Sequence, residues 1–431
     1  MKQFWFLALR NLQRNKRRNL ATGSAIVLGF AGILLLGGYE NRVSNYLRVY
    51  TVYVMHTGHL ALYSRDGLEK LQYKPLKYSL DPKAQQSIEQ ALHDEPQVDF
   101  FERRMSGAGL VGNGSISLPF VAQAYDPQID ERVQSDPQVK KWVPRAGYFA
   151  KGRGLWNYQE ELGALALSKG LALALGKKSV YDEGGDTNVQ LMAGTWQGPM
   201  NAIDAEVVGH FNTGFREAVN SALYISYKKL QQLYDTENIG RYSIWLKDID
   251  KTEQVATRLA ARLERMGVNV DVISWDEERL SPYYTGTMQF LRSLITFIGV
   301  VLATVISFSV LNSTTMTVVE RLPEIGMYRS IGFRRKQVCK MFVHESFWLS
   351  IASLVIGAIV GHLAIAAINA AKIIYHPPGV PDGLQLLLVP NILHSFVSGA
   401  IILSLTLLTT YFAVARTLHM RVADLLGGIR R

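Results

Sequence analysis

The sequence predicts a membrane protein with four transmembrane α-helices plus a large α+β extracytoplasmic domain inserted between helices one and two. Four apolar stretches each reach the roughly 20 residues that a helix needs to cross a bilayer. A long polar segment, 41–288, separates the first stretch from the other three. Positive charge gathers beside the apolar stretches, and the formal net charge of the chain is +10. Because only helices and closed barrels satisfy the backbone in lipid, stretches of this length indicate helices.

The boundaries follow from the ends of the apolar stretches. The nine predicted parts, in chain order, are an amphipathic interfacial helix at 1–19, a first span at 20–40, the external core domain with its stalk at 41–288, a second span at 289–313, a cytoplasmic segment at 314–340, a third span at 341–373, a short external loop at 374–391, a fourth span at 392–415 and a cytoplasmic tail at 416–431. The first span is longer than the apolar region of a secretory signal peptide and lacks an Ala-x-Ala exit, so an uncleaved anchor is favoured over a signal peptide.

Charge sets the orientation. Six Lys and Arg residues and no acid precede Leu20, and Lys and Arg also outnumber acids in the segments 314–340 and 416–431. The segment 41–288 is nearly balanced, with 28 basic residues against 30 acidic ones. Cytoplasmic segments carry the excess of Lys and Arg, so both termini and 314–340 are expected in the cytoplasm and 41–288 outside.

This distribution also excludes one common reading of a basic chain. The cations sit beside helix ends rather than in a patch of the polar domain, which argues against nucleic-acid binding. The single cysteine, Cys339, falls in the cytoplasmic segment. The external domain is therefore expected to fold without a disulfide, and it is large enough to do so.

Local patterns predict the elements of the soluble parts. Residues 1–18 form an amphipathic helix with apolar positions such as Phe4 and Trp5. Tyr46, Tyr50 and Tyr53 recur at helical spacing, so the first span is expected to continue outside as a stalk. Within the external domain, periodicity predicts a mixture of strands and helices. The strands are expected at 59–63, 205–208 and 223–225, the helices at 84–92 and 255–266, and a rigid proline turn at 377–381.

Each pattern typical of catalysis or metal binding fails on spacing. The run from Gly176 to Ser179 lacks the second glycine and the hydroxyl residue that a phosphate loop needs. His344-Glu345 begins like a zinc-protease helix, but Trp348 stands where the second histidine should be. The acids at 182–186 do not have the spacing of a calcium loop, and a turn is favoured.

The pair His56 and His59 stands in a segment that reads as extended, so the two side chains are expected on opposite faces. Two ordinary polar histidines are favoured over a metal site. No Gly-x-Ser-x-Gly elbow is present either. We therefore predict no catalytic residue and no metal on this chain.

The segment after the second span predicts a short amphipathic helix. Pro323 suits a first helical turn, Glu324 favours a helix N-terminus, and Leu322, Ile325 and Tyr328 share one face. Two readings stay open from periodicity alone. The helix lies in the lipid headgroups, or it docks into a groove on a cytoplasmic partner and transmits that partner's movement through the spans.

This segment also resembles a known family. The run from Glu320 to Gly332 is similar to the Glu-Arg-x-x-Glu-Ile-Gly-x-x-Arg-x-x-Gly signature of FtsX-like ABC transporter permeases, whose layout of one span, a large external domain and three further spans is also found here. Pro323 and Tyr328 depart from the basic or aliphatic residues more usual at their positions. Weaker likenesses to the branch of macrolide exporters and lipoprotein-releasing permeases, which has a MacB-like periplasmic domain, lie in 8–18, 58–60, 151–153, 169–172, 185–186, 207–214 and 273–275.

The resemblance implies a permease subunit in a bacterial inner membrane that moves a lipoprotein or another amphipathic substrate by mechanotransmission. It implies a second permease subunit, the same or paralogous, and a separate cytoplasmic ABC ATPase dimer that carries ATP and Mg, so that this chain holds no cofactor. A periplasmic acceptor or adaptor is a further partner of such systems. The implied docking residues are those of the coupling helix: Glu320, Arg321, Pro323, Glu324, Ile325, Gly326, Tyr328, Arg329 and Gly332.

Two features of the spans complete the predictions. Ala25 and Gly29 have the small-xxx-small spacing that permits close packing with a partner helix, or they are ordinary small residues of a membrane helix. Glu345, at the start of the third span, is expected to pair with Arg335 or Lys336.

Two other function classes stay open. One is a transmitter of ATPase motion to a periplasmic partner that transports nothing, and the other is a membrane receptor or scaffold that works without an ATPase. The size of the external domain argues against the first class. A neighbouring ATPase reading frame would support the ABC class, and a neighbouring hydrolase or kinase would favour the others.

Overall fold

The computed structural model describes residues 16–143, 149–152, 155, 163–177, 186–211, 220–375 and 384–418. The chain divides into two compact units, a helical unit and an α+β unit. The helical unit comprises Met1–Ser44, Met288–Ile374 and Gln385–Arg431, and the α+β unit comprises Asn45–Thr287 with Tyr375–Leu384. Of the helix predicted at 1–19, residues 1–15 lie outside the described residues, and 16–19 belong to the long helix of the first span. The proline turn at 377–381 and the tail beyond 418 also lie outside the described residues.

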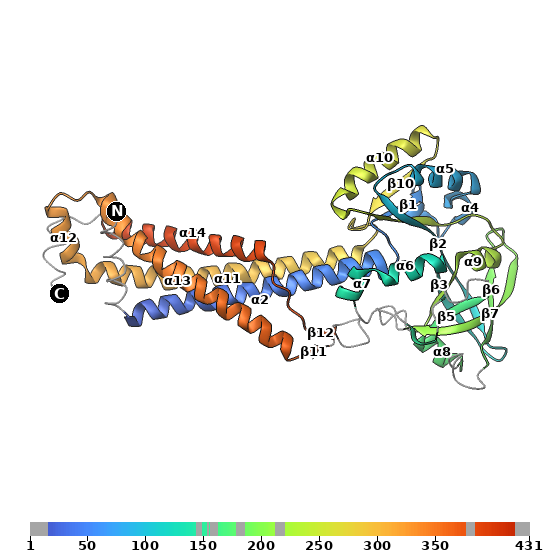
Figure 1. Ribbon diagram of the computed structural model, residues 1–431, viewed down its shortest axis with the longest axis horizontal. Helices are drawn as coiled ribbons and strands as arrows, with labels where there is room; N and C mark the ends of the chain where they lie inside the picture. The colour runs from blue at the N-terminus through green and yellow to red at the C-terminus, as the bar shows by residue number, and fades with distance from the viewer. Residues whose placement is uncertain are drawn as a thin grey trace. The chain divides into compact units, whose positions relative to one another are not determined.

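The helical unit is built from long apolar helices (Figure 1). They are α2 (Lys16–Val49), α11 (Pro282–Glu320), α13 (Arg335–Ala370) and α14 (Ile392–Thr417), with the short α12 (Leu322–Ser330) between α11 and α13. Two short strands, β11 (Ile374–Tyr375) and β12 (Leu384–Gln385), precede α14. Within the described residues, four helices are long and apolar enough to cross a membrane, which confirms the predicted number of candidate spans.

Small residues let α13 approach α2 closely. A Cβ atom on Gly357 would stand 3.1 Å from the carbonyl oxygen of Val27, and one on Gly361 would stand 3.3 Å from Cα of Ala31. Between helices in lipid, where burial of apolar surface gains little, such close backbone approach supplies van der Waals contact. The Gly357-x-x-x-Gly361 pair therefore sets the packing of α13 on α2.

Hydroxyl groups join α13 to α14. Ser350 and Thr406 share a hydrogen bond of 3.0 Å, and the Thr410 hydroxyl donates to Ser346 at 2.9 Å. Ser350, Thr406 and Thr410 are buried. These groups satisfy one another inside the helical unit and hold α13 and α14 in register.

The first half of the α+β unit is a four-stranded antiparallel sheet in the order β10-β1-β9-β2. Its strands are β1 (Leu60–Ser64), β2 (Val98–Gly112), β9 (Arg241–Leu246) and β10 (Val270–Ser274), and its two crossover helices are α5 (Pro82–His93) and α10 (Thr252–Arg265). Helix α5 joins β1 to β2 and α10 joins β9 to β10, so the topology is the ferredoxin-like β-α-β-β-α-β arrangement. Figure 1 shows α5 and α10 beside each other over this sheet.

The second half is inserted between β2 and β9 and closes on itself. It contains β3 (Ser117–Tyr125), β5 (Ala164–Ser168), β6 (Asn188–Gly194), β7 (Met200–Phe211) and β8 (Ala222–Ser226), with β4 (Phe149–Gly152) paired to the edge of β7. The pairing runs β2-β3-β8-β5-β7-β6 and returns from β6 to β2. Strand β2 is thus shared: 98–104 pair with β9 in the open sheet, and 105–112 pair with β3 in the closed one.

Asp-Pro pairs start three of the helices in the α+β unit. Asp81, Asp126 and Asp136 each accept a hydrogen bond from a backbone N–H of the first turn, at 2.8, 3.0 and 2.7 Å. The following proline fixes φ at the first helical position, where no N–H is needed. These caps begin α5, α6 (Pro127–Ser135) and α7 (Pro137–Trp142).

The shorter helices complete the unit. They are α3 (Gly67–Lys70), α4 (Pro75–Tyr78), α8 (Lys169–Ala174), α9 (Tyr227–Tyr234), a 3₁₀ turn at Ile249–Lys251 and a π-helical turn, η1, at Tyr50–Val54. The predicted helices at 84–92 and 255–266 are confirmed as α5 and α10, and the predicted strands at 59–63, 205–208 and 223–225 fall on β1, β7 and β8.

Candidate functional site

The first candidate site is α12 and the residues that fix it in the helical unit. Pro323 stands in its first turn together with the acidic Glu324, and Arg329 stands in its last turn. An acid near the N-terminus and a base near the C-terminus both complement the helix dipole. The sequence therefore favours a helix of this length at this point, between two much longer ones.

Gly332 explains why α12 ends where it does. Its φ is +100°, a left-handed conformation that favours glycine. Its N–H donates to the Arg329 carbonyl at 3.1 Å, and the Phe333 N–H donates to the Tyr328 carbonyl at 3.0 Å. The Tyr328 and Phe333 rings lie 5.7 Å apart. These are the two hydrogen bonds and the apolar contact of a Schellman motif, which turns the chain from α12 toward α13.

Two ion pairs attach the start of α12 to other helices. Glu320 accepts from Nη1 of Arg18 in α2 at 2.8 Å. Arg321, nearly buried, donates from Nη1 and Nη2 to the two carboxylate oxygens of Glu345 in α13, at 3.0 and 3.3 Å. The prediction that Glu345 pairs with Arg335 or Lys336 is wrong, because the bend between α11 and α12 brings Arg321 to it first.

The apolar face of α12 is covered by the chain itself. Leu322 and Ile325 are 5% and 2% exposed. They belong to a cluster with residues of α11, of α13 and of α14 with its C-cap, namely Val318, Val338, Cys339, Phe342, Val414 and Leu418. Gly326 is also buried, whereas Glu324, Tyr328 and Arg329 are half-buried. Two of the three residues predicted to share the docking face thus hold α12 in place.

The opposite side of α12 remains open. Pro323, Met327 and Ser330 are exposed, and Ile331, just after the helix, is 70% exposed. Met327 is 49% exposed. A short helix fixed at both ends and with an apolar outer face is suited to bind a groove rather than to carry out chemistry. Within the described residues no group of three or more His, Cys, Asp or Glu could hold a metal ion.

The structure also shows where the two small residues singled out in the first span, Ala25 and Gly29, lie. Gly29 is buried, and a Cβ atom there would stand 2.7 Å from Cδ1 of Ile306 in α11, while Ala25 is half-buried. Gly29 therefore permits close approach to a helix of the same chain. Pairing of Ala25 and Gly29 with a second subunit stays a prediction.

A second candidate site lies in the α+β unit and was not predicted. The chain passes through the π-helical turn η1, and His56 then adopts a left-handed φ of 52°. The His56 carbonyl accepts from the Ser243 hydroxyl at 2.6 Å and from Nη2 of Arg241 at 3.3 Å. The prediction of an extended segment with two ordinary polar histidines is wrong here, because β9 binds this turn and both His56 and His59 are buried.

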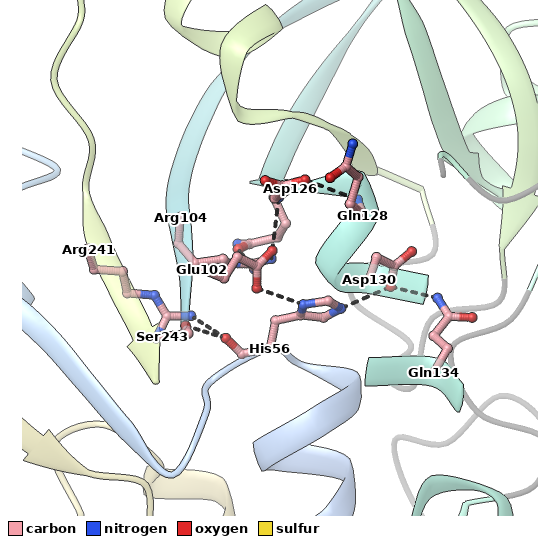
Figure 2. Close-up of polar contacts among 10 residues, drawn as sticks. His56, Glu102, Arg104, Asp126, Gln128, Asp130, Gln134, Arg241 and Ser243 are labelled. Atoms are coloured by element: carbon pink, nitrogen blue, oxygen red, sulfur yellow. Dashed lines mark hydrogen bonds and ion pairs between the residues drawn. The ribbon is translucent and has the colours of Figure 1, made fainter. Parts of the chain in front are cut away.

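The His56 ring bridges two buried carboxylates (Figure 2). Nδ1 lies 3.0 Å from Oε2 of Glu102 in β2, and Nε2 lies 3.1 Å from Oδ1 of Asp130 in α6. Glu102 also accepts from the Asp126 N–H at 3.0 Å, which ties the cluster to the α6 cap. Arg104, two residues after Glu102 on the same face of β2, lies with its guanidinium 5.5 Å from the Tyr125 ring.

Burial and the charge of neighbouring groups shift the pKa of His56 in opposite directions. Burial disfavours the charged imidazole, but the charge of Glu102 and the hydrogen bonds to Asp130 and Glu102 outweigh it, so the pKa of His56 is raised. Burial lowers the pKa of the nearby Arg104. His59 differs: burial, reinforced by the charge of Arg48, lowers the pKa of His59 to about 4, and its Nδ1 accepts from the Leu246 N–H at 2.9 Å. The two carboxylates thus favour the protonated form of His56, whereas burial favours the neutral form of His59.

Comparison with known proteins finds a family that is similar to most of the helical unit. Residues 296–422 match the family described as FtsX-like permease C-terminal. The chain is 25% identical over 187 residues to the macrolide export ATP-binding/permease protein MacB of Bradyrhizobium diazoefficiens, a match over 43% of this chain and 28% of the relative. It is 24% identical over 204 residues to the lipoprotein-releasing system transmembrane protein LolC of Xylella fastidiosa, over 46% of each chain. These matches span less than half of the relatives' length.

Among solved structures, the chain is similar to the extracellular domain of the noncanonic ABC-type transporter YknZ from Gram-positive bacteria. The identity is 15% and the TM-score 0.33, over 50% of this chain and 99% of that one. The periplasmic region of MacB from Actinobacillus actinomycetemcomitans gives 11% identity and the same TM-score, over 50% of this chain and 88% of that one.

Proposed function

We propose, from the premise that residues 296–422 are an FtsX-like permease domain, that this chain is the permease subunit of an ABC transporter. A separate ATPase subunit hydrolyses ATP, and α12 is the coupling helix to which it binds. The chain lies in the inner membrane with both termini and α12 in the cytoplasm and the α+β unit outside. The lysine and arginine distribution described above supports this orientation.

The observation that carries the proposal is the construction of α12. Leu322 and Ile325 fix one side of the helix, and the pairs Glu320–Arg18 and Arg321–Glu345 fix its start. The outer side, with Met327 and the adjoining Ile331, is left exposed. A helix held this firmly at the junction of α11 and α13 passes a push from a bound protein directly into both helices.

The cargo we propose is a lipoprotein or another amphipathic molecule, extracted from the membrane or moved outside it. Support comes from the relatives, since one is a macrolide exporter and another belongs to a lipoprotein-releasing system. The buried hydroxyl groups of α13 and α14 bond to each other, so they serve the packing of the two helices. Mechanical transmission to the α+β unit suits such a cargo better than conduction through the helices.

The test is purification of the tagged chain from its native membrane in mild detergent, with mass spectrometry of the companions and an ATPase assay on the eluate. The proposal predicts an ABC ATPase in stoichiometric amount and measurable hydrolysis. Elution of the folded chain with no ATPase, over several detergents, would favour a receptor or scaffold. An ATPase companion with no effect of the chain on export would favour a transmitter that transports nothing.

A further inference from the structure

A cleft of about 560 Å³ opens in the α+β unit beside His56. It lies where β2 leaves β9 and joins β3, because Arg104 is the last residue of β2 paired with β9 and Met105 the first paired with β3. Both residues line the cleft. Its volume falls within the range of about 300–1,000 Å³ that is usual for small-molecule sites.

The charges on the wall of this cleft are of one sign. His56, Arg104 and Arg241 line it, and no Asp or Glu does so among the described residues. The two carboxylates that bind His56, Glu102 and Asp130, are buried and stand outside the lining. Figure 2 shows Arg241 and Asp130 on opposite sides of His56. A ligand in the cleft therefore meets cationic groups while the compensating acids lie behind them.

Arg104 has hydrogen-bond donors that no described residue accepts from. It is 3% exposed, its Nη2 donates to Oε1 of Gln123 at 3.2 Å, and its Nη1 stands 4.0 Å from Oε1 of Glu102. Within the described residues, Nε and Nη1 have no hydrogen-bond partner. Leaving the hydrogen-bond donors of a buried cation without acceptors costs free energy, so the Arg104 side chain can bind an acceptor from a ligand. Gln123, which accepts from Arg104, also lines the cleft.

The rest of the lining is mostly apolar. The apolar contributors are Val54, Met55, Leu68, Leu71, Met105, Val121, Phe211, Ala222 and Leu280. Val121 and Met55 are 49% and 44% exposed although they face a concave surface. Apolar side chains left exposed in a cleft with a few converging polar groups are typical of a ligand site.

We propose that this cleft binds an anionic amphiphile, an alkyl chain with a carboxylate or phosphate head. The head accepts hydrogen bonds from Arg104 and Arg241, and the chain covers Val121 and its apolar neighbours. The inference concerns the α+β unit alone and does not rest on the coupling role of α12. A free fatty acid and a lysophospholipid share this chemistry, and the test distinguishes them.

The test uses the full chain in nanodiscs of zwitterionic phosphatidylcholine and a fatty acid that carries a photoactivatable diazirine in its chain. After illumination, mass spectrometry maps the labelled residues. We expect labels on cleft peptides that contain Met105, Val121 or Phe211. Excess laurate or lauroyl lysophosphatidate should compete for this label, and the stronger competitor identifies the head group. Dodecanol and inorganic phosphate should not compete. Full competition by phosphate alone would overturn the amphiphile, and labels confined to the helical unit would overturn the site.

Variants separate the head contact from the chain contact. Arg104→Met should reduce cleft labelling at least tenfold, while Arg104→Lys, which keeps the charge, should retain part of it. Val121→Trp fills the cleft from an exposed position and should also abolish labelling. Its control is Leu110→Trp, at a position on β2 that is 42% exposed and does not line the cleft. Circular dichroism verifies folding. Should Arg104→Met fail to fold, Val121→Trp still decides, since unchanged labelling of that variant contradicts the proposal.

Discussion

Arg321 and Glu345 form a bidentate ion pair between the start of α12 and α13. Their side chains are 7% and 15% exposed. Removing one partner of a buried pair leaves the other charge without compensation, at a cost of about 3–5 kcal/mol. We therefore expect Arg321→Gln and Glu345→Gln each to lower the thermal unfolding midpoint of the purified chain in detergent.

The double variant Arg321→Gln/Glu345→Gln separates the pair from its members. It leaves no unpaired charge, so its midpoint should lie above that of either single variant. If the two single effects simply add, the two side chains do not act as a pair. Arg334→Gln, at an exposed residue before α13, serves as the control for loss of a cation.

Gly332→Ala should weaken the turn after α12. A residue with a Cβ at a φ of +100° costs on the order of 1–3 kcal/mol, although nothing lies within 4 Å of that Cβ position. Gly299→Ala is the matched control, since its surroundings are equally open and its φ is ordinary. Alanine is favoured over glycine inside a helix, so the control should keep or raise the unfolding midpoint. Equal midpoints for the two variants would remove the Schellman motif as the reason for glycine here.

Gly357→Leu should separate α13 from α2. The added side chain meets the Val27 carbonyl, a backbone atom that cannot move without the helix. Gly299→Leu in α11 places the same side chain in open space. The distance between spin labels at exposed positions 28 and 359 should increase in Gly357→Leu and stay unchanged in Gly299→Leu. An unchanged distance in both would show that the helices do not pack through Gly357.

The stability of the α+β unit should fall as the pH is lowered from about 6.5 to 4. Because the pKa of His59 is lowered to about 4 in the folded chain, the unfolded chain binds a proton in this window that the folded chain does not. The effect reaches up to about 3 kcal/mol. His59→Asn, whose side-chain oxygen replaces Nδ1 as acceptor, should flatten the dependence. Tryptophan fluorescence during denaturation at several pH values measures it, and an unchanged slope in His59→Asn would refute it.

The contribution of His56 to stability should have the opposite pH dependence to that of His59. The pKa of His56 is raised in the folded chain, so its contribution is complete below 6.5 and is lost as the pH rises through the folded pKa. His56→Gln should therefore lower stability at pH 6 more than at pH 9. An equal loss at both pH values would mean that the charge on the imidazole contributes nothing.

Long apolar and periodic patterns in the sequence were enough to predict helices in both units. Four apolar stretches gave the number of candidate spans, and the periodicity at 84–92 and 255–266 gave two helices of the α+β unit. The Glu-Arg-Leu-Pro-Glu run predicted the start of α12 because Pro323 and Glu324 act locally. The spacing Gly357-x-x-x-Gly361 is a further local signal for close helix contact.

Contacts between residues far apart in the sequence could not be predicted. Glu345 pairs with Arg321 across 24 positions because of a bend between helices, which nothing in the local sequence specifies. His56 meets Glu102 and Asp130 only after β2, α6 and β9 assemble around it. One hint was available in β2, where Glu102 and Arg104 share a strand face next to buried apolar residues. Buried charges of this kind require partners, although the sequence does not say which.

The measurement that tests the coupling role of α12 most directly is the amount of ATPase subunit retained by the immobilised chain, in wild type and in Met327→Asp. Met327 is exposed on α12, so the charge should leave the fold intact and reduce the retained ATPase at least tenfold. Glu324→Lys should likewise reduce coupled hydrolysis. Met266→Asp, the same exchange at an exposed residue of the α+β unit, should retain the wild-type amount. Full retention and full hydrolysis in Met327→Asp would contradict docking through α12.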